Sequence, residues 1–426
     1  MPDGRSKLLP KVGASVGDIS PRATTALAGR GGPPRMAPPL EKSLEVNAVV
    51  LDDGNLMAAL VAVDTLFCSR ALLDRVSECL LPKTRSRLGK ALFLVASHTH
   101  HAPSLDPSKP LLGAVDKTYF EQTAKTIAST IESAVANRTT FKNMPRGNAA
   151  CAANARRRLK AIRILKRAPF IERTIFTLPN HAPDVPRDLV LYIAHDFSGT
   201  PVFTLWSWPC HPTAFPHPNV VDGDFPGKVR QLLRQQLDAA DLPVVFFPGF
   251  SGDLRADASP YPVPLWKRLM TPFARPFAEV TITNFNLLCD LVGETCKKAI
   301  VNAAPIPEKK WTMSHSTINL RLRDFMPDTT HNGQIDLSHL QFGSLGIFMI
   351  GTEMCSTWTP ILVPLLPPGT ILTGYCNDVP CYLPTDSQVL EGGYEVKGFR
   401  HSFGVDGTFA SDLKHRVTSA LSKLSV

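Results

Sequence analysis

The sequence is short of the features that mark several specialised classes of protein. No apolar run approaches the roughly 18 residues that a membrane-spanning helix needs, so we expect no transmembrane segment. Residues 1–7 lack the apolar segment of a signal peptide, which predicts a cytoplasmic protein. The nine cysteines are scattered, odd in number and free of CxxC pairs, and this favours reduced thiols over a disulfide framework.

Acidic residues are fewer than basic ones, 37 against 46, which leaves a formal charge of +9. Part of the excess lies in residues 156–167, and such a segment can attract nucleic acid, anionic lipid or an acidic substrate. It has neither interleaved aromatic residues nor a nucleic-acid motif. We therefore interpret it as a solvated loop or helix face and expect no nucleic-acid partner. Peripheral membrane contact and the oligomeric state stay open.

What the chain does contain is an ordinary globular composition, with 44% hydrophobic and 19% charged residues among 426. Apolar strands alternate with amphipathic helices, which predicts an α/β fold of mixed sheets flanked by helices. We find no internal repeat or low-complexity linker, so we expect one domain over residues 1–426. The expected strands are 46–51, 57–64, 91–95, 189–195, 201–208, 244–247, 343–350 and 370–375, and the expected helices are 69–81, 116–137, 228–237, 286–301 and 411–424.

Three histidines follow the apolar run 91–95 within four positions, as His98, His100 and His101. Along an extended chain His98 and His100 point to the same side, because side-chain direction repeats every two residues. Two imidazoles on one side suit a divalent metal, most often zinc. The alternative is a surface turn that happens to be rich in histidine.

Other expected strands also run into polar residues. Asp64, His211, Asp253 and Glu353 each come just after an apolar strand. Ligands of α/β proteins collect beyond strand ends, so we expect a metal site there. Taken singly, each residue has an ordinary explanation, such as a turn or a helix cap.

The order and spacing of these short motifs resemble the catalytic domain of the neutral/alkaline non-lysosomal ceramidases. The resemblance runs from Gly17-Asp18-Ile19-Ser20-Pro21 to about Tyr394. It implies a zinc hydrolase of an amide bond, with an N-acyl lipid such as ceramide as the substrate. The zinc ligands that it implies come from His98-Thr99-His100, Cys210-His211-Pro212-Thr213, Gly351-Thr352-Glu353 and Tyr382-Leu383-Pro384-Thr385, and they are His98, His211, Glu353 and Tyr382.

The resemblance also implies residues that face the substrate. His100 matches a histidine beside the substrate carbonyl, and Tyr394 matches a second tyrosine of the pocket. Arg156, or its neighbour Arg157, resembles an arginine near the substrate. Asp253 is a candidate for orienting a ligand from behind. A zinc ion with an open position lowers the pKa of bound water to about 7 and polarises a carbonyl.

The sequence departs from the ceramidases at their Gly-Asp-x-Ser-Pro motif, which reads Gly252-Asp253-Leu254-Arg255-Ala256 here. Arg255 stands where the family has its serine, and a guanidinium stays protonated and is no nucleophile. It can bind a carboxylate or phosphate, or help to hold an oxyanion. The departure favours attack by zinc-activated water and puts ceramide itself in doubt. We also expect no immunoglobulin-like C-terminal domain, because the chain ends soon after the catalytic region.

Three functions follow from these observations. The first is a zinc-dependent amidohydrolase acting on an N-acyl lipid. The second keeps the metal but cleaves a smaller anionic amide or ester that Arg255 reads. The third is a zinc-binding or ligand-binding protein without catalysis, which the missing serine motivates.

Overall fold

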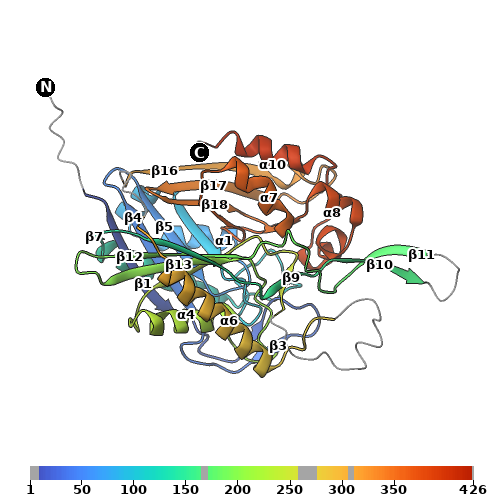
Figure 1. The fold of residues 1–426 in the computed structure, drawn as a ribbon, viewed down its shortest axis with the longest axis horizontal. Coiled ribbons are helices and arrows are strands. Elements are labelled where there is room, and N and C mark those ends of the chain that lie inside the picture. The colour runs from blue at the N-terminus through green and yellow to red at the C-terminus, as the bar shows by residue number, and fades with distance from the viewer. Residues whose placement is uncertain (1–8, 165–170, 258–275, 306–310, 425–426) are drawn as a thin grey trace.

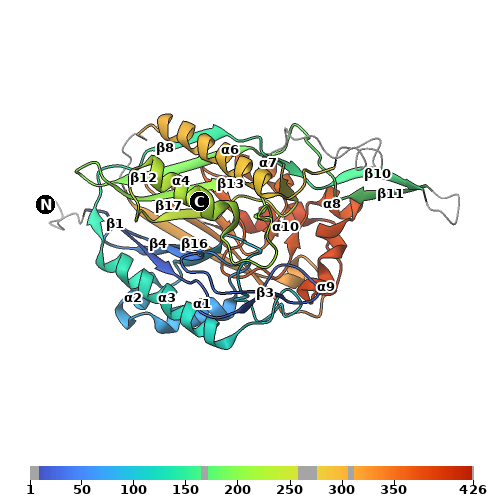
Figure 2. The same cartoon turned by 90° about the horizontal axis from the view of Figure 1, so that it is seen from below.

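Three β-sheets form the interior of the protein, and helices cover their outer faces (Figures 1 and 2). The computed structural model describes residues 9–164, 171–257, 276–305 and 311–424. Its architecture confirms the predicted α/β class with mixed sheets and flanking helices. Among the described residues, none of the helices combines the length and the apolar composition that crossing a bilayer requires.

The first sheet has five strands, and three helices lie on one side of it (Figure 2). Only its β5–β6 pair is parallel. The helix α3 begins after Asp116, whose side chain accepts a hydrogen bond from the Tyr119 N–H and so satisfies an unpaired donor of the first turn. In spatial order the strands are β6 (Leu92–Ala96), β5 (Met57–Val63), β4 (Glu45–Asp52), β1 (Lys11–Asp18) and β7 (Thr139–Thr140), and the helices are α1 (Arg70–Cys79), α2 (Pro82–Leu88) and α3 (Lys117–Ala136).

The second sheet has four strands, covered by the helices α4 (Asp224–Gln236) and α6 (Ile282–Val301). The helix α4 begins four residues before the predicted 228–237, so part of the expected loop is helical. Pro226 fits there because the first turn of a helix has no intrahelical partner for its N–H groups. The strands, in spatial order, are β14 (Val244–Pro248), β13 (Pro201–Trp208), β12 (Asp188–His195) and β8 (Arg146–Ala150).

The third sheet contains a strand pair that the sequence did not predict. β16 (Met313–Arg321) and β17 (Gln334–Phe342) pair with each other, and β17 continues to β18 (Leu345–Ile350) and β20 (Ile371–Thr373). The β16 strand is an edge strand with mostly polar, partly exposed residues, so it lacks an apolar signature. The last helices are α7 (Thr359–Leu362), α8 (Asp386–Glu391), α9 (Arg400–Phe403) and α10 (Leu413–Leu421).

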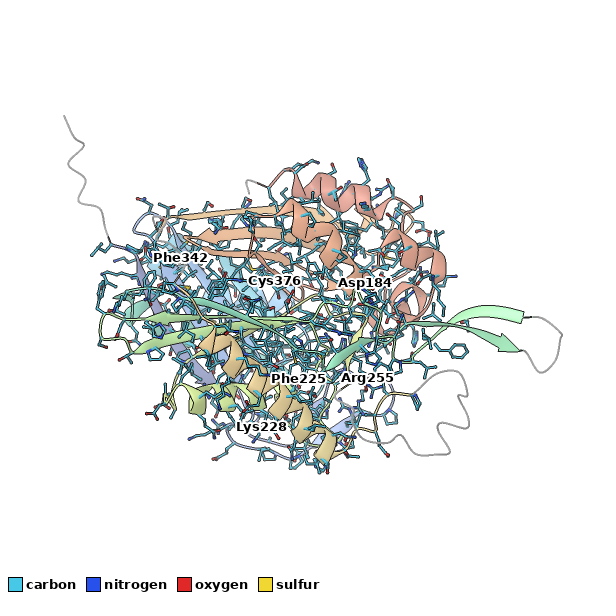
Figure 3. The ribbon with its side chains drawn as sticks, viewed as in Figure 1. Asp184, Phe225, Lys228, Arg255, Phe342 and Cys376 are labelled. Atoms are coloured by element: carbon cyan, nitrogen blue, oxygen red, sulfur yellow. The ribbon has the colours of Figure 1, made fainter. Side chains whose placement is uncertain are left out.

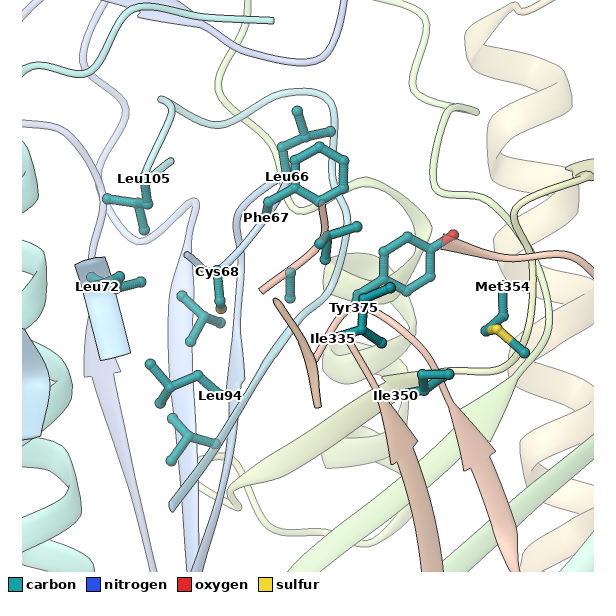
Figure 4. Close-up of a cluster of buried hydrophobic side chains, with 14 of the residues drawn as sticks. Leu66, Phe67, Cys68, Leu72, Leu94, Leu105, Ile335, Ile350, Met354 and Tyr375 are labelled. Atoms are coloured by element: carbon teal, nitrogen blue, oxygen red, sulfur yellow. The ribbon is translucent and has the colours of Figure 1, made fainter. Parts of the chain in front are cut away.

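Apolar side chains join the sheets into one body. One buried cluster contains Phe342 and Cys376 and lies between the three sheets, and another contains Phe225 and packs the second sheet against α4 and α6 (Figure 3). A third cluster joins the first sheet to the third through Leu94, Ile350 and their neighbours (Figure 4). Burial of this apolar surface is the main favourable contribution to folding, and it fixes the sheet ends relative to one another.

The parallel strand pairs direct their carboxyl ends to one region of the molecule. These pairs are β5–β6, β13–β14, β18–β20 and β19–β21. His98, His211, Asp253 and Glu353 follow the ends of β6, β13, β14 and β18, as expected for an α/β fold. The short pairs around this region are β2 (Thr25–Leu27) with β3 (Arg35–Ala37), β9 (Asn154–Arg156) with β15 (Leu254–Ala256), β10 (Leu159–Ile164) with β11 (Ile171–Phe176), and β19 (Glu353–Met354) with β21 (Tyr382–Leu383).

Candidate metal centre and active site

The histidine loop is a turn rather than the end of an extended strand. The strand β6 ends at Ala96, and His98 has a φ of +66°, in the left-handed region. The expectation that His98 and His100 share a side through strand alternation is therefore wrong. A non-glycine residue in this region costs free energy, and such strain is tolerated where the surroundings enforce it. Here the turn itself brings both imidazoles to the same place.

Three imidazoles from two distant segments meet at one point. The Nε2 atom of His211, which follows β13, lies 3.1 Å from Nε2 of His98 and 3.3 Å from Nε2 of His100. The ligand atoms of the three residues all lie within 4.8 Å of one another, a spacing that can hold a metal ion. His98 and His211 are buried, and His100 is partly exposed.

The other ring nitrogens determine which tautomer each histidine adopts. Each Nδ1 faces a backbone carbonyl: that of Leu66 for His98, at 2.8 Å, and that of Gly29 for His100, at 2.8 Å. His211 faces the carbonyl of Ser251 at 3.4 Å. A carbonyl only accepts, so each Nδ1 carries the proton and each Nε2 keeps a lone pair. Three lone pairs directed at one point fit a cation.

Burial keeps these imidazoles neutral, which a metal ligand requires. It lowers the pKa of His98 to about 3. Burial and the neighbouring histidines also hold the pKa values of His100 and His211 well below the ordinary value.

Glu353 lies next to His98, and Tyr382 lies opposite Glu353 because their strands, β19 and β21, pair in parallel with these two residues in register. The Glu353 Oε2 atom lies 3.6 Å from Nε2 of His98 and has no hydrogen-bond partner although it is buried. Burial raises the pKa of this carboxyl to about 8. A buried carboxylate oxygen without a partner is costly, and a metal ion would stabilise it.

Arg157, rather than Arg156, is the arginine on the tyrosine side of the site. Its Nη2 atom donates to the Tyr382 hydroxyl at 3.2 Å and to the carbonyl of Gly252 at 2.7 Å. Burial alone would lower its pKa, but Tyr382 and Glu395 raise it well above the ordinary value. The guanidinium stays charged and fixes the phenol.

Arg156 points elsewhere, because it is the last residue of β9 and neighbouring side chains of a strand alternate. Its guanidinium donates to Asp184 at 2.7 Å and to Ser356 Oγ at 3.0 Å. The sequence left both arginines open, and the contacts place Arg157, rather than Arg156, beside Tyr382.

Tyr394 lies at the rim of this region. It opens a short π-helix over Tyr394–Gly398, and 42% of its surface is exposed. Its ring packs edge-to-face on Tyr382, with 5.6 Å between centroids, and the Arg157 guanidinium lies 5.4 Å from it. The arrangement leaves Tyr394 free to contact a ligand that approaches from solvent.

Asp253 is fully buried and ties loops together. It accepts hydrogen bonds from the Ser356 N–H at 2.5 Å and from Gln388 Nε2 at 2.9 Å. Ser356 follows Glu353 and Gln388 follows Tyr382 along the chain, so Asp253 holds the two segments that carry these residues. Burial raises the pKa of its carboxyl.

Tyr375 and Ser251 also belong to this site, although the sequence did not predict them. The Tyr375 ring stacks on His98, with centroids 4.3 Å apart, and its hydroxyl lies 3.2 Å from Ser251 Oγ. The Ser251 carbonyl in turn faces His211. Neither residue type is a frequent zinc ligand, so their only signal was their position beyond strand ends.

Gly29 was missed as well, although it lies in a segment rich in glycine and proline. Its φ is +95°, and a Cβ atom there would come within 2.4 Å of the His100 Nδ1 atom. Only glycine allows the backbone to approach the imidazole this closely.

Arg255 lies in the middle of β15, opposite Ala155 of β9. Its guanidinium packs over the ring of Phe277, 5.0 Å from the centroid. No described residue forms an ion pair with this guanidinium, and the positive charge of Arg157 acts on it.

Comparisons with known proteins identify the fold. No family model matches the sequence, and no curated protein sequence matches it. The structure is similar to that of neutral ceramidase from Pseudomonas aeruginosa, with a TM-score of 0.69 and 12% identity, over 97% of this chain and 73% of that one. A ceramidase complexed with C2 also has a TM-score of 0.69, with 11% identity, over 97% of this chain and 74% of that one. The resemblance to the ceramidases is confirmed, as a shared fold.

Proposed function

We propose that this protein is a zinc-dependent hydrolase that cleaves an amide bond of an N-acyl substrate. The observation that carries the proposal is the convergence of three Nε2 lone pairs on one point, of which those of His98 and His211 would bind the ion and that of His100 would lie beside it. The ceramidase fold supports the reaction class, because its named neighbours are enzymes that cleave the amide of ceramide. The unpartnered Glu353 oxygen beside His98 supports the metal.

Four residues would hold the ion. His98 and His211 supply neutral imidazoles, Glu353 supplies a carboxylate, and Tyr382 supplies a phenol whose oxygen is already oriented by Arg157. Nitrogen and oxygen donors of this kind suit zinc. When bound, zinc supplies a Lewis acid for the scissile carbonyl and a source of activated water.

His100 is the residue that we assign to proton transfer. It is the most exposed of the three histidines, and its Nδ1 proton is held by the Gly29 carbonyl. Its Nε2 lone pair therefore faces the reacting atoms and can take up a proton and pass it to the leaving amine. Arg157 and Tyr394 line the approach and hold the substrate in place.

The chain offers no serine where the ceramidases carry theirs, because Arg255 occupies that position. An arginine forms no acyl-enzyme, so water attacks the carbonyl directly in this proposal. The proton released by water goes to His100, and the amine leaves with it.

Metal analysis and activity together test the proposal. We expect purified protein to contain about one equivalent of zinc and to cleave a fluorescent short-chain ceramide or another N-acyl amide. The His98→Ala variant should lose both, since each ligand of a zinc site is worth on the order of several kcal/mol of metal binding. His415→Ala, at an exposed histidine of α10, serves as the matched control.

Two results would contradict the proposal. One is zinc far below one equivalent with no activity gained on adding it. The other is full metal content with no amidase activity on a broad panel of N-acyl amides, which would identify a binding protein on a hydrolase fold.

A further inference from the structure

We propose that Arg255 forms a subsite for a carboxylate on the substrate, next to the scissile amide. The inference rests on the proposed amidohydrolase function and names its substrate class: an N-acyl compound with a free carboxylate, such as an N-acyl amino acid. Three observations carry it, namely the unpaired guanidinium, the pocket that it lines, and the position of that pocket beside the histidines.

The guanidinium of Arg255 has no ion-pair or hydrogen-bond partner among the described residues. It is held by the Phe277 ring, 5.0 Å away, and is partly buried. The charge of Asp257 acts on it, and the carboxylate of Asp257 lies 2.8 Å from His181 Nε2. Buried charges in proteins are normally paired, so an unpaired one that an aromatic ring holds in place suits an anion from outside.

Arg255 lies in an electropositive environment, which favours binding of an anion. Burial lowers the pKa of Arg255, and the positive charges of Arg157 and Arg30 lower it further. The guanidinium remains protonated, since its ordinary pKa exceeds 12. An incoming carboxylate would be attracted by all three cations in a poorly solvated place.

Arg255, labelled in Figure 3, also lines a pocket. Thr213 and Asn284 contribute hydrogen-bonding side chains, and Phe285 and Leu288 contribute apolar ones. Thr213 is two residues from His211, and its N–H donates to the His211 carbonyl at 2.9 Å. The segment that carries His211 therefore also contributes Thr213 to the pocket wall, and the proposal is that one substrate spans the two.

A carboxylate fits this subsite better than a phosphate. A single guanidinium binds the two oxygens of a carboxylate in a planar, bidentate pair. Glu279 also lines the pocket, and its charge would oppose the second negative charge of a phosphate monoester.

A matched pair of substrates tests the subsite: N-dodecanoylglycine and its neutral carboxamide, N-dodecanoylglycinamide. We expect the wild-type protein to cleave the acid with a kcat/KM at least about tenfold higher, as expected for one charge-assisted bidentate contact. Arg255→Gln should abolish that preference, mainly through KM, and Arg255→Lys should restore part of it. Arg22→Gln, at a largely exposed arginine, should leave the preference unchanged.

A binding measurement separates the failure of this inference from the failure of the proposed function. Calorimetry with N-dodecanoylglycine on the His98→Ala/His211→Ala protein needs no catalysis. If the acid binds there and Arg255→Gln weakens binding about tenfold, the subsite stands even when no amide is cleaved. Equal binding of acid and carboxamide, or tighter binding of N-dodecanoyl phosphoethanolamine, would overturn the inference.

Discussion

The buried carboxyl of Glu395 and the partly buried carboxyl of Asp222 have pKa values shifted in opposite directions. Burial alone would raise the pKa of Glu395, but Arg157 and Arg158, whose nitrogens lie 2.8 and 2.6 Å from its oxygens, lower it. Asp222 forms no ion pair within the part of the chain that the structure describes, although the charge of Arg230 acts to lower its pKa. Burial and the charge of Asp224 raise its pKa to about 7. The partner, rather than the residue type, decides the charge of a buried acid.

The difference has a structural meaning for the site. Glu395 holds Arg157 against Tyr382, so the tyrosine side is fixed by full charges. Asp222 lies behind the histidine loop, where its backbone accepts from Thr99 Oγ1 at 2.7 Å and donates to the His101 carbonyl at 3.0 Å. The histidine side is thus fixed by neutral hydrogen bonds, which suits a place where a cation is expected.

The largest expected effect comes from removing the charge of Glu395. Glu395→Gln would leave two buried arginines short of a counter-charge, which costs about 3–5 kcal/mol of unfolding free energy. Urea unfolding at pH 7 measures it. Because the pKa of Glu395 is lowered on folding, its contribution is present above the unfolded pKa and disappears as pH falls through the folded pKa.

Glu78→Gln, at an exposed glutamate paired with Arg75, is the matched control and should change stability by less than about 1 kcal/mol. A loss from Glu395→Gln no larger than the control would mean that the charged side needs no counter-charge, and the comparison would fail.

Local patterns in the sequence were enough to identify His98, His211 and Glu353 as candidate site residues at strand ends. His98, His211 and Glu353 each follow an apolar strand, and strand ends can be recognised from a few neighbouring residues. The parallel pairing that brings those ends together follows from general rules for α/β folds. The turn at His98 was unpredictable, because a left-handed φ in a non-glycine residue is enforced by the surrounding structure.

The arrangement of Arg157 and Glu395 around Tyr382 could not be predicted, because it depends on contacts between residues far apart in the sequence. Arg157 and Glu395 pair across 238 positions. The choice between Arg156 and Arg157 is decided by where β9 ends and which way successive side chains point, and an error of one residue reverses it. Boundaries of strands are the least certain part of a sequence-based prediction.

An intermediate effect, opposite in sign, is expected for Asp222→Asn. The folded state binds a proton at Asp222 up to a pH of about 7, whereas the unfolded chain releases it near 4. Stability therefore falls as pH rises from about 4 to 7, and the asparagine variant avoids this loss. At pH 8 we expect the variant to be more stable by about 1–4 kcal/mol, and at pH 4 nearly equal.

Urea unfolding at several pH values checks this prediction, with Asp290→Asn at an exposed position of α6 as the control. A variant that is less stable at pH 8 would show that Asp222 is charged and paired in the folded protein, as Glu395 is. The contrast between the two sides would then be lost.

The smallest effect concerns the link between the Asp222 loop and the histidines. Thr99→Val keeps the shape of a fully buried side chain but removes the hydrogen bond to the Asp222 carbonyl and the one from the His101 N–H. We expect a loss of about 1–2 kcal/mol in unfolding free energy. We also expect about tenfold weaker zinc binding, because Thr99 sits between His98 and His100 and its contacts orient them.

Thr139→Val, at an exposed position of β7, controls for the substitution. Weaker zinc binding with unchanged stability would still support a neutral, hydrogen-bonded histidine side, whereas unchanged zinc affinity would show that the turn holds its histidines without this loop.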